Sequence, residues 1–425
     1  LKVGSEATVE PLKLAAEGCV ETSGQRLQIT AAEGCVEPMS HPLPQIIKRE
    51  FLRLAKDPVY IFCMVLAPLV CFVFFTSLMD EGLPQELPVG LVDQDATTTS
   101  RQISRNLDAF QQTRIVAHYP DASEARRAVQ RGEIYGFYLI PKGTARKALR
   151  QEQPRLSFYM NYSYLVAGSL IYRDMRMMSE LASGAAARSV LYAKGATEGQ
   201  AMAYLQPIVI ETHAIGNPWL NYNIYLSNTL LPGILMLFVF MVTVYSIGSE
   251  IKERQGSRLL AMAQGNMLHI IVGKLLPQTL IFLLMGSAYV FYLYGYLQFP
   301  CHCGIPSIWA LMALFVLASQ GMGVMMISAL PTLRLGLSFA SLWAVISFSI
   351  CGMSFPVMAM DPTLQGLSLL FPLRHYFLIY VNSALDGYPL LNAWPYIVAL
   401  IGFASLPYLL AWRLKHVLLH AKYEK

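Results

Sequence analysis

Long apolar runs alternate with polar segments along this chain. Six of the runs are almost free of charged residues and reach about 20 residues, the length that a helix needs to cross the hydrocarbon core of a membrane. They span residues 59–78, 229–248, 275–297, 308–330, 335–357 and 393–412. The pattern predicts a polytopic α-helical membrane protein with six spans.

Residues 80–228 follow a different pattern. Short apolar segments typical of strands lie at residues 89–93, 114–119, 134–140 and 156–161. Helical segments separate them, and this alternation predicts an α/β layer. Helical periodicity then continues from Tyr164 toward Ala203 with a break at Gly195, which predicts a helical hairpin packed on the α/β layer.

Composition agrees with a membrane protein. Of 425 residues, 55% are hydrophobic and only 14% are charged, whereas soluble proteins carry roughly 25% charged residues. The net charge is +5, and no basic stripe with interleaved aromatic residues is present. We therefore expect no nucleic-acid partner.

Basic residues indicate the orientation of the chain. Lys and Arg collect before the first apolar run, after the second, between the fourth and fifth, and after the sixth. Because such residues favour the cytoplasmic side of short loops, both termini are expected to be cytoplasmic. Residues 80–228 then form an external domain. It lies between residues 43–78, which hold an interfacial helix and the first span, and a five-span domain in residues 229–425.

The N-terminal part has two sections. Residues 1–38 are polar and contain a short segment that occurs twice, and Met39 follows them. We expect a disordered or non-native extension there. Residues 43–56 form an amphipathic helix that is expected to lie along the inner membrane surface. Glu50 falls in its apolar stripe, and we expect it to snorkel in a pair with Arg53.

Two places hold residue types that bind metals. Cys301 and Cys303 flank His302, but three consecutive residues cannot easily surround one ion and no fourth ligand is evident. Asp93 and Asp95 stand at a strand end, where ending the strand and capping the next helix is the favoured interpretation. We expect no metal site, and the role of the two cysteines stays open.

The chain has no recognisable catalytic motif. The pair Gly273-Lys274 precedes Leu275 and lacks the upstream glycine of a phosphate-binding loop. Neither the zinc motif His-Glu-x-x-His nor the nucleophile motif Gly-x-Ser-x-Gly occurs. We therefore expect no catalytic residue and no enzyme activity. The spans are also expected to lack a buried carboxylate or lysine of the kind used in proton relays, which argues against a proton-coupled transporter.

The loop at residues 249–266 combines charges, a glycine turn and a leucine pair. These features come from Glu250, Glu253, Arg254, Gly256, Ser257, Arg258, Leu259 and Leu260. Two further marks are Gly273-Lys274 at the third span and, near the C-terminus, Phe355, Pro356, Pro372 and Gly387. On this six-span plan, the marks resemble those of ABC-2 type permeases, the membrane subunits of ABC exporters, in the branch with a large external domain between the first two spans.

The resemblance implies roles for two regions. Residues 249–266 would be the cytoplasmic coupling loop, and residues 358–391 an external re-entrant region between the last two spans. In the loop, Glu253, Arg254 and Arg258 could pair across an interface. Leu259 and Leu260 would be its buried anchor, and Gly256 would permit a tight turn.

The resemblance also implies a function. The chain would be the permease of an ATP-driven exporter in a bacterial inner membrane, moving a lipophilic or amphipathic compound outward. ATP and Mg²⁺ would bind to a separate ABC ATPase and no cofactor to this chain. Other partners would be a second permease copy, identical or related, membrane lipid, and a periplasmic adaptor with an outer-membrane channel. Two alternatives stay open: a membrane receptor or scaffold that presents its external domain, and a secondary transporter.

Overall fold

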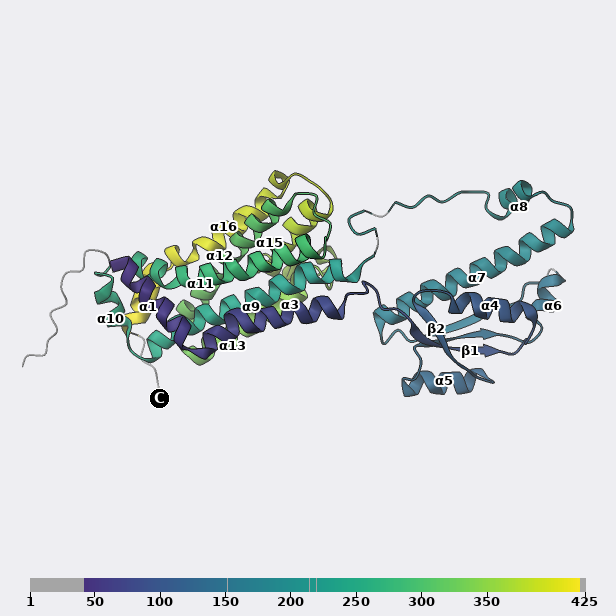
Figure 1. The fold of residues 1–425 in the computed structure, drawn as a ribbon, viewed down its shortest axis with the longest axis horizontal. Helices are drawn as coiled ribbons and strands as arrows, with labels where there is room; N and C mark the ends of the chain where they lie inside the picture. Colours follow the sequence, from purple (N-terminus) through teal and green to yellow (C-terminus); the bar gives the residue numbers. More distant parts are fainter. Residues whose placement is uncertain (1–41, 151, 214, 219, 421–425) are drawn as a thin grey trace, which may run out of the picture. The chain divides into compact units, whose positions relative to one another are not determined.

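The computed structural model describes residues 42–150, 152–213, 215–218 and 220–420 (Figure 1). The predicted N-terminal extension at residues 1–38 lies outside the described residues. The described part is mostly helical and contains one small sheet.

Six helical segments are long and apolar enough to cross a membrane, counted over the described residues. The first is Pro58–Leu78, made of α2 (Pro58–Ile61), a π-helical turn η1 (Phe62–Leu66) and α3 (Ala67–Leu78). The others are α9 (Tyr222–Lys252), α11 (Met267–Val290) with the π-helical turn η2 (Phe291–Tyr296), α12 (Ile305–Ala329), α13 (Leu333–Ile350) and Leu390–Leu409, which contains η5 (Leu390–Ala393) and α16 (Trp394–Leu409). The predicted number of spans is confirmed.

The boundaries of three spans differ clearly from the prediction. Helix α11 begins at Met267, eight residues before the predicted run, because Asn266 caps its first turn by accepting a hydrogen bond from the amide of Leu268. Helix α9 begins at Tyr222, several residues before the apolar run, because Asn221 caps its first turn by accepting hydrogen bonds from the amides of Asn223 and Ile224. Helix α13 ends at Ile350 rather than at residue 357. Gly352 has a φ of +105°, a conformation that side-chain-bearing residues rarely adopt and that ends the helix.

Helices α9, α11 and α12 form the centre of the helical bundle. Between 56% and 72% of the residues in their apolar windows are buried, against 17% to 22% for the other three spans. Helix α12 packs against α9, α11 and α16, and α13 packs along α9. Most side chains of the first, fifth and sixth spans are therefore turned away from the core of this chain.

Two groups of short helices complete the helical region. Helix α1 (Pro42–Lys56) packs on α11. Helices α10 (Gly256–Met262) and α17 (Ala411–His420) also contact α11, at the same end of the bundle (Figure 1). The segment between the last two spans holds a 3-10 turn η3 (Val357–Ala359), α14 (Pro362–Ser368), α15 (Pro372–Ile379) and a π-helical turn η4 (Tyr380–Leu385). Each of these elements is too short to cross a membrane.

The sheet region has four strands in the order β2-β1-β3-β4. Strand β1 (Leu87–Asp93) is parallel to both β2 (Thr113–His118) and β3 (Gly136–Ile140), and β4 (Ser157–Met160) pairs antiparallel with β3. The ends of all four strands lie within two residues of the predicted segments. The predicted α/β layer is present.

Helices cover both faces of the sheet (Figure 1). Helices α4 (Thr98–Asp108) and α7 (Leu165–Ala193) share one apolar core with the sheet, and α5 (Ala122–Arg131) covers the other face. Helix α6 (Thr144–Leu149) follows β3, and α8 (Glu198–Leu205) follows α7 after a turn at Gly195, whose φ is +81°. The break predicted at Gly195 therefore marks the end of a real helix.

Candidate functional site

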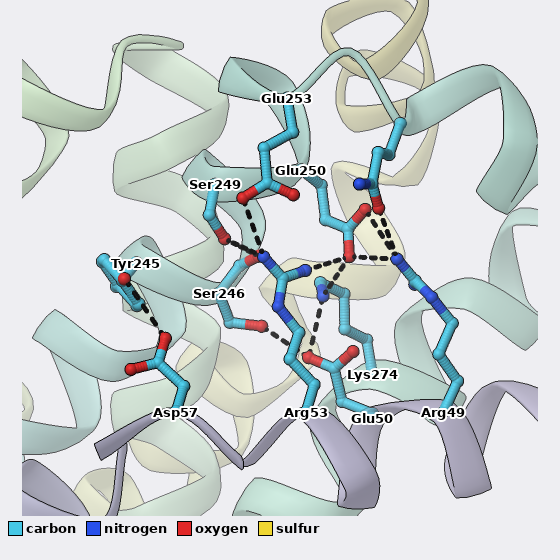
Figure 2. Close-up of polar contacts among 11 residues, drawn as sticks. Arg49, Glu50, Arg53, Asp57, Tyr245, Ser246, Ser249, Glu250, Glu253 and Lys274 are labelled. Carbon is cyan, nitrogen blue, oxygen red and sulfur yellow. Dashed lines mark hydrogen bonds and ion pairs between the residues drawn. The ribbon is translucent and has the colours of Figure 1, made fainter. Parts of the chain in front are cut away.

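A cluster of charged side chains joins α1 to the ends of α9 and α11 (Figure 2). We call it the buried charge cluster. It consists of Arg49, Glu50 and Arg53 from α1, Glu250 from α9, and Lys274 from α11. The side chains of Glu50 and Glu250 are fully buried, and that of Lys274 is 4% exposed.

The sequence of α1 explains why Glu50 points inward. Ile46, Glu50 and Leu54 are the buried residues of this helix and recur every four positions, so they share one face. The helix packs this face on α11, which brings a carboxylate along with the two apolar side chains. An uncompensated charge at such a position would be strongly unfavourable, so it requires a partner.

Lys274 is the partner of Glu50. Its Nζ lies 2.8 Å from Oε1 of Glu50 and 3.2 Å from Oε1 of Glu250. The hydroxyl of Ser246 also donates to Oε1 of Glu50, at 2.8 Å. One ammonium group thus bridges two buried carboxylates from two different helices.

Glu250 is also bound by both arginines of α1. Arg49 donates to its two carboxylate oxygens at 2.9 and 3.1 Å and to Gln255 at 2.9 Å. Arg53 donates to Glu250 and also to the hydroxyl of Ser249, and it lies 3.5 Å from the half-exposed Glu253. With Glu253 included, three basic side chains face three carboxylates.

The charges around Arg53 favour its protonated form. Burial alone would lower the pKa of its guanidinium, but the negative charge of Glu250, with smaller effects from other groups, raises the pKa above its usual value. Buried ion pairs add little net stability compared with apolar packing, whereas removal of one partner is costly. We infer that the buried charge cluster mainly specifies where α1 docks.

Two expectations about charge were wrong. Glu50 does not snorkel in a pair with Arg53; it is buried and binds Lys274 and Ser246. The spans also do contain a buried carboxylate and a buried lysine, Glu250 and Lys274. Both lie near span ends, just beyond the apolar runs, so hydropathy gave no signal. The burial of Glu50 could have been predicted from its position, because it is spaced four residues from Ile46 and from Leu54 on the apolar face of α1.

Gly273 lets α1 approach α11 closely. A Cβ atom at this position would lie 2.6 Å from Cγ2 and 2.9 Å from Cβ of Ile46, far closer than carbon atoms pack. The adjacent residues Gly273 and Lys274 therefore act at one contact: the glycine admits the helix and the lysine neutralises its carboxylate.

Gly256 has a different role from the one predicted. Its φ is not in the left-handed region, and the tight turn is made instead by Arg254, with a φ of +56°. A Cβ atom at Gly256 would lie 2.2 Å from the backbone oxygen of Leu418. The glycine is needed because the start of α10 touches the backbone of α17.

The predicted loop at residues 249–266 contains the short helix α10. Glu253, Arg254, Ser257 and Arg258 are exposed and give this end of the molecule a charged face. Leu259 is 1% exposed and Leu260 is half-buried, and both pack on the core of this chain. Leu259 is therefore not available as an anchor for another protein.

The four marks near the C-terminus do not form one site. Phe355 is half exposed, next to Pro356. Pro372 is buried and begins α15. Gly387 has a φ of +72°, and a Cβ atom there would lie 3.4 Å from Cβ of His302. Their roles here are local: they begin helices, end them and shape turns.

Asp93 and Asp95 fix the backbone around them. Asp93 accepts from the amides of Asp95 and Ala96 and from the hydroxyl of Ser100. Asp95 accepts from the amides of Gly143 at 2.6 Å and Ala145 at 3.0 Å, so it caps α6 rather than the next helix. Over the residues that the structure describes, no group of three or more His, Cys, Asp or Glu could hold a metal ion.

The buried charge cluster suits a mechanical role better than a chemical one. Each of its charged groups is engaged by an opposite charge, and the cluster connects α1, α9 and α11 to the base of α10. A displacement of α10 would therefore reach two spans and the helix that precedes a third.

Comparisons with known proteins agree with this architecture. Residues 58–413, more than four fifths of the chain, match the family described as ABC-2 family transporter protein. A comparison with curated proteins finds no match. The family match covers all six spans, the sheet region and α10, and on this evidence the chain belongs to the ABC-2 family of transporter proteins.

Proposed function

We propose that the chain is the permease subunit of an ATP-driven exporter and receives work from a separate ABC ATPase through α10. The observation that carries this proposal is the placement of α10. Its outer face is charged and exposed, while its inner face and base are tied to α17 and to the buried charge cluster. The ATPase would supply ATP hydrolysis with Mg²⁺.

Force would enter through exposed side chains and leave through buried ones. Glu253, Arg254 and Arg258 offer charges of both signs to a partner. Gln255, at the start of α10, accepts from Arg49. Movement of α10 would therefore shift α1, and through the buried charge cluster it would shift the ends of α9 and α11.

The remaining features of the proposal concern assembly and substrate. The first, fifth and sixth spans bury little of their apolar surface within this chain, which suits contact with lipid and with a second permease copy, identical or related. An amphipathic or lipophilic compound fits such surroundings. We place the chain in a bacterial inner membrane with both termini cytoplasmic and the sheet region outside, where an adaptor linked to an outer-membrane channel could bind.

The test compares charge reversals in the complete chain reconstituted with its ATPase. Glu253→Lys and Arg258→Glu should each weaken ATPase binding by about tenfold or more, because like charges would then face each other. Stimulation of ATP hydrolysis by the permease should fall with it. Arg127→Glu, an exposed reversal on α5, is the matched control. Unchanged binding and stimulation in both variants of the coupling region would refute the coupling role.

The buried carboxylates favour a second candidate function, that of a proton-coupled secondary transporter. Glu50 and Glu250 beside Lys274 are the residue types that secondary transporters use for proton coupling. Transport by the reconstituted chain that follows an imposed proton gradient without ATPase or ATP would favour this candidate. Transport that requires both ATPase and ATP favours the exporter. A receptor or scaffold would show no transport under either condition.

A further inference from the structure

The loop between η2 and α12 holds two thiols that the proposed coupling does not use. The Sγ atoms of Cys301 and Cys303 lie 3.8 Å apart. Both side chains are half-buried, so reagents can reach them. A disulfide has an S–S length of about 2.05 Å, so a small movement within one short loop would close the bond.

The loop is held against the segment between the last two spans. The amide of His302, between the two cysteines, donates to the carbonyl of Ala384 at 3.0 Å. This hydrogen bond fixes the loop to η4. Burial raises the pKa of Tyr376 in α15, and the nearby thiols of Cys301 and Cys303 raise it further. The two cysteines therefore lie close to the buried tyrosine and to the element that follows it.

The two thiols are not equivalent. The hydrogen bond between the two thiols lowers the pKa of Cys301 to about 7, whereas the same contact, with burial, raises the pKa of Cys303. Cys301 is therefore the thiol that ionises first. A thiolate is the form that attacks disulfides, and a neighbouring thiol can then complete the exchange.

We propose that Cys301 and Cys303 form a reversible dithiol–disulfide site, oxidised by the disulfide of a small molecule or of a thiol–disulfide oxidoreductase. The Cys301 thiolate attacks one sulfur of the oxidant, forms a mixed disulfide and expels the first thiolate. Cys303 then gives up its proton and attacks the Cys301 sulfur, which expels the second. Two protein thiols become one disulfide, and the oxidant is reduced to two thiols.

The site would act on the loop that carries it. A disulfide between residues 301 and 303 constrains the backbone on both sides of His302. It would thus change the contact of His302 with Ala384 and with Gly387. In the topology proposed above, this loop lies outside, where oxidising conditions preserve disulfides.

The test uses the complete purified chain and needs no transport assay, so its result is independent of the proposed function. The protein is treated with glutathione disulfide, alkylated and digested with chymotrypsin. Cleavage after Leu297 and Trp309 releases a peptide whose only cysteines are Cys301 and Cys303. We expect this peptide to lack alkyl groups and to be two hydrogen atoms lighter than the dithiol form. Reduction before alkylation should give the doubly alkylated peptide.

Single variants test Cys301 as the attacking thiol and Cys303 as the thiol that completes the exchange. Cys303→Ser should accumulate a mixed disulfide with glutathione at Cys301, because the second thiol is missing. Cys301→Ser should form no disulfide within this peptide, because the attacking thiol is missing. Cys351→Ser, at a buried thiol elsewhere in the chain, is the matched control and should leave the peptide's oxidation unchanged. Double alkylation after oxidant treatment, or disulfides from this loop to other cysteines, would overturn the proposal.

Discussion

At the scale of single residues, Lys274 has the most demanding position. It is the buried cation between Glu50 and Glu250. Replacement by Met keeps most of the side-chain volume but leaves two buried carboxylates short of a partner. We expect Lys274→Met to lower the free energy of unfolding by about 3–5 kcal/mol, measured as a fall in thermal stability in detergent. Lys252→Met, at an exposed lysine of α9, should have little effect.

A double variant separates lost pairing from lost packing. Glu50→Gln removes the carboxylate that Lys274 neutralises, so Glu50→Gln with Lys274→Met should cost less than the two single changes added together. Residues in direct contact commonly show such coupling, of about 0.5–3 kcal/mol. Strict additivity would mean that the contact at 2.8 Å contributes no coupling energy.

Substitutions of Gly273 in α11 and Gly256 in α10 should differ in whether a second substitution rescues them. Gly273→Ala should destabilise the docking of α1 by about 1–3 kcal/mol through overcrowding. Ile46→Ala should restore part of it, because the crowded atoms belong to the side chain of Ile46. Gly256→Ala should not be rescued by Leu418→Ala, since there the obstacle is a backbone oxygen. Protease sensitivity of α1 would measure the effect at Gly273 and its rescue, and protease sensitivity of α17 would measure those at Gly256. Equal rescue at the two sites would contradict the assigned contacts.

At the scale of elements, Asp95 joins the end of β1 to the start of α6. Burial alone would raise the pKa of its carboxyl, but hydrogen bonds from Ala145, Thr97 and Gly143 lower it below its usual value. A carboxyl whose pKa is lower in the folded state stabilises that state above its unfolded pKa, near 4. This contribution is lost as the pH falls through the folded pKa.

Removal of the Asp95 carboxylate should therefore loosen α6. We expect Asp95→Ala to cost about 1 kcal/mol, as for other lost helix caps. Amide hydrogen exchange of residues 143–147 in the complete chain should become faster at neutral pH, and less so in acid. Asp121→Ala, which removes the cap of α5, is the control and should speed exchange in α5 instead. Unchanged exchange at α6 would show that the cap has no energetic role.

Local patterns predicted the elements better than their contacts. Strands and spans follow from the spacing of apolar residues within short windows, so β2 and α12 lie close to their predicted positions. The partner of Glu50 could not be found in this way, because Lys274 is 224 residues further along the chain. The role of Gly256 was missed for the same reason, since its constraint comes from Leu418.

At the scale of the whole molecule, the distribution of basic residues predicts that the sheet region and the loop at residues 249–266 lie on opposite sides of the membrane. Arg127 on α5 and Lys252 at the end of α9 are both exposed, so each can be replaced singly by cysteine. In a cysteine-free background and intact cells, a membrane-impermeant thiol reagent should label the first and not the second, because the positive-inside rule keeps the basic loop in the cytoplasm. After lysis both should react. Labelling of the second site in intact cells would refute this topology.

The buried charge cluster also has a consequence for the synthesis of the chain. The 224 residues between Glu50 and Lys274 take roughly 10–45 s to translate at about 5–20 residues per second. Throughout this interval Glu50 has no basic partner from α11, so its carboxylate must stay hydrated. Helix α1 can dock only after α9 and α11 have been inserted. The helix that leaves the ribosome before every span is thus among the last to reach its final place.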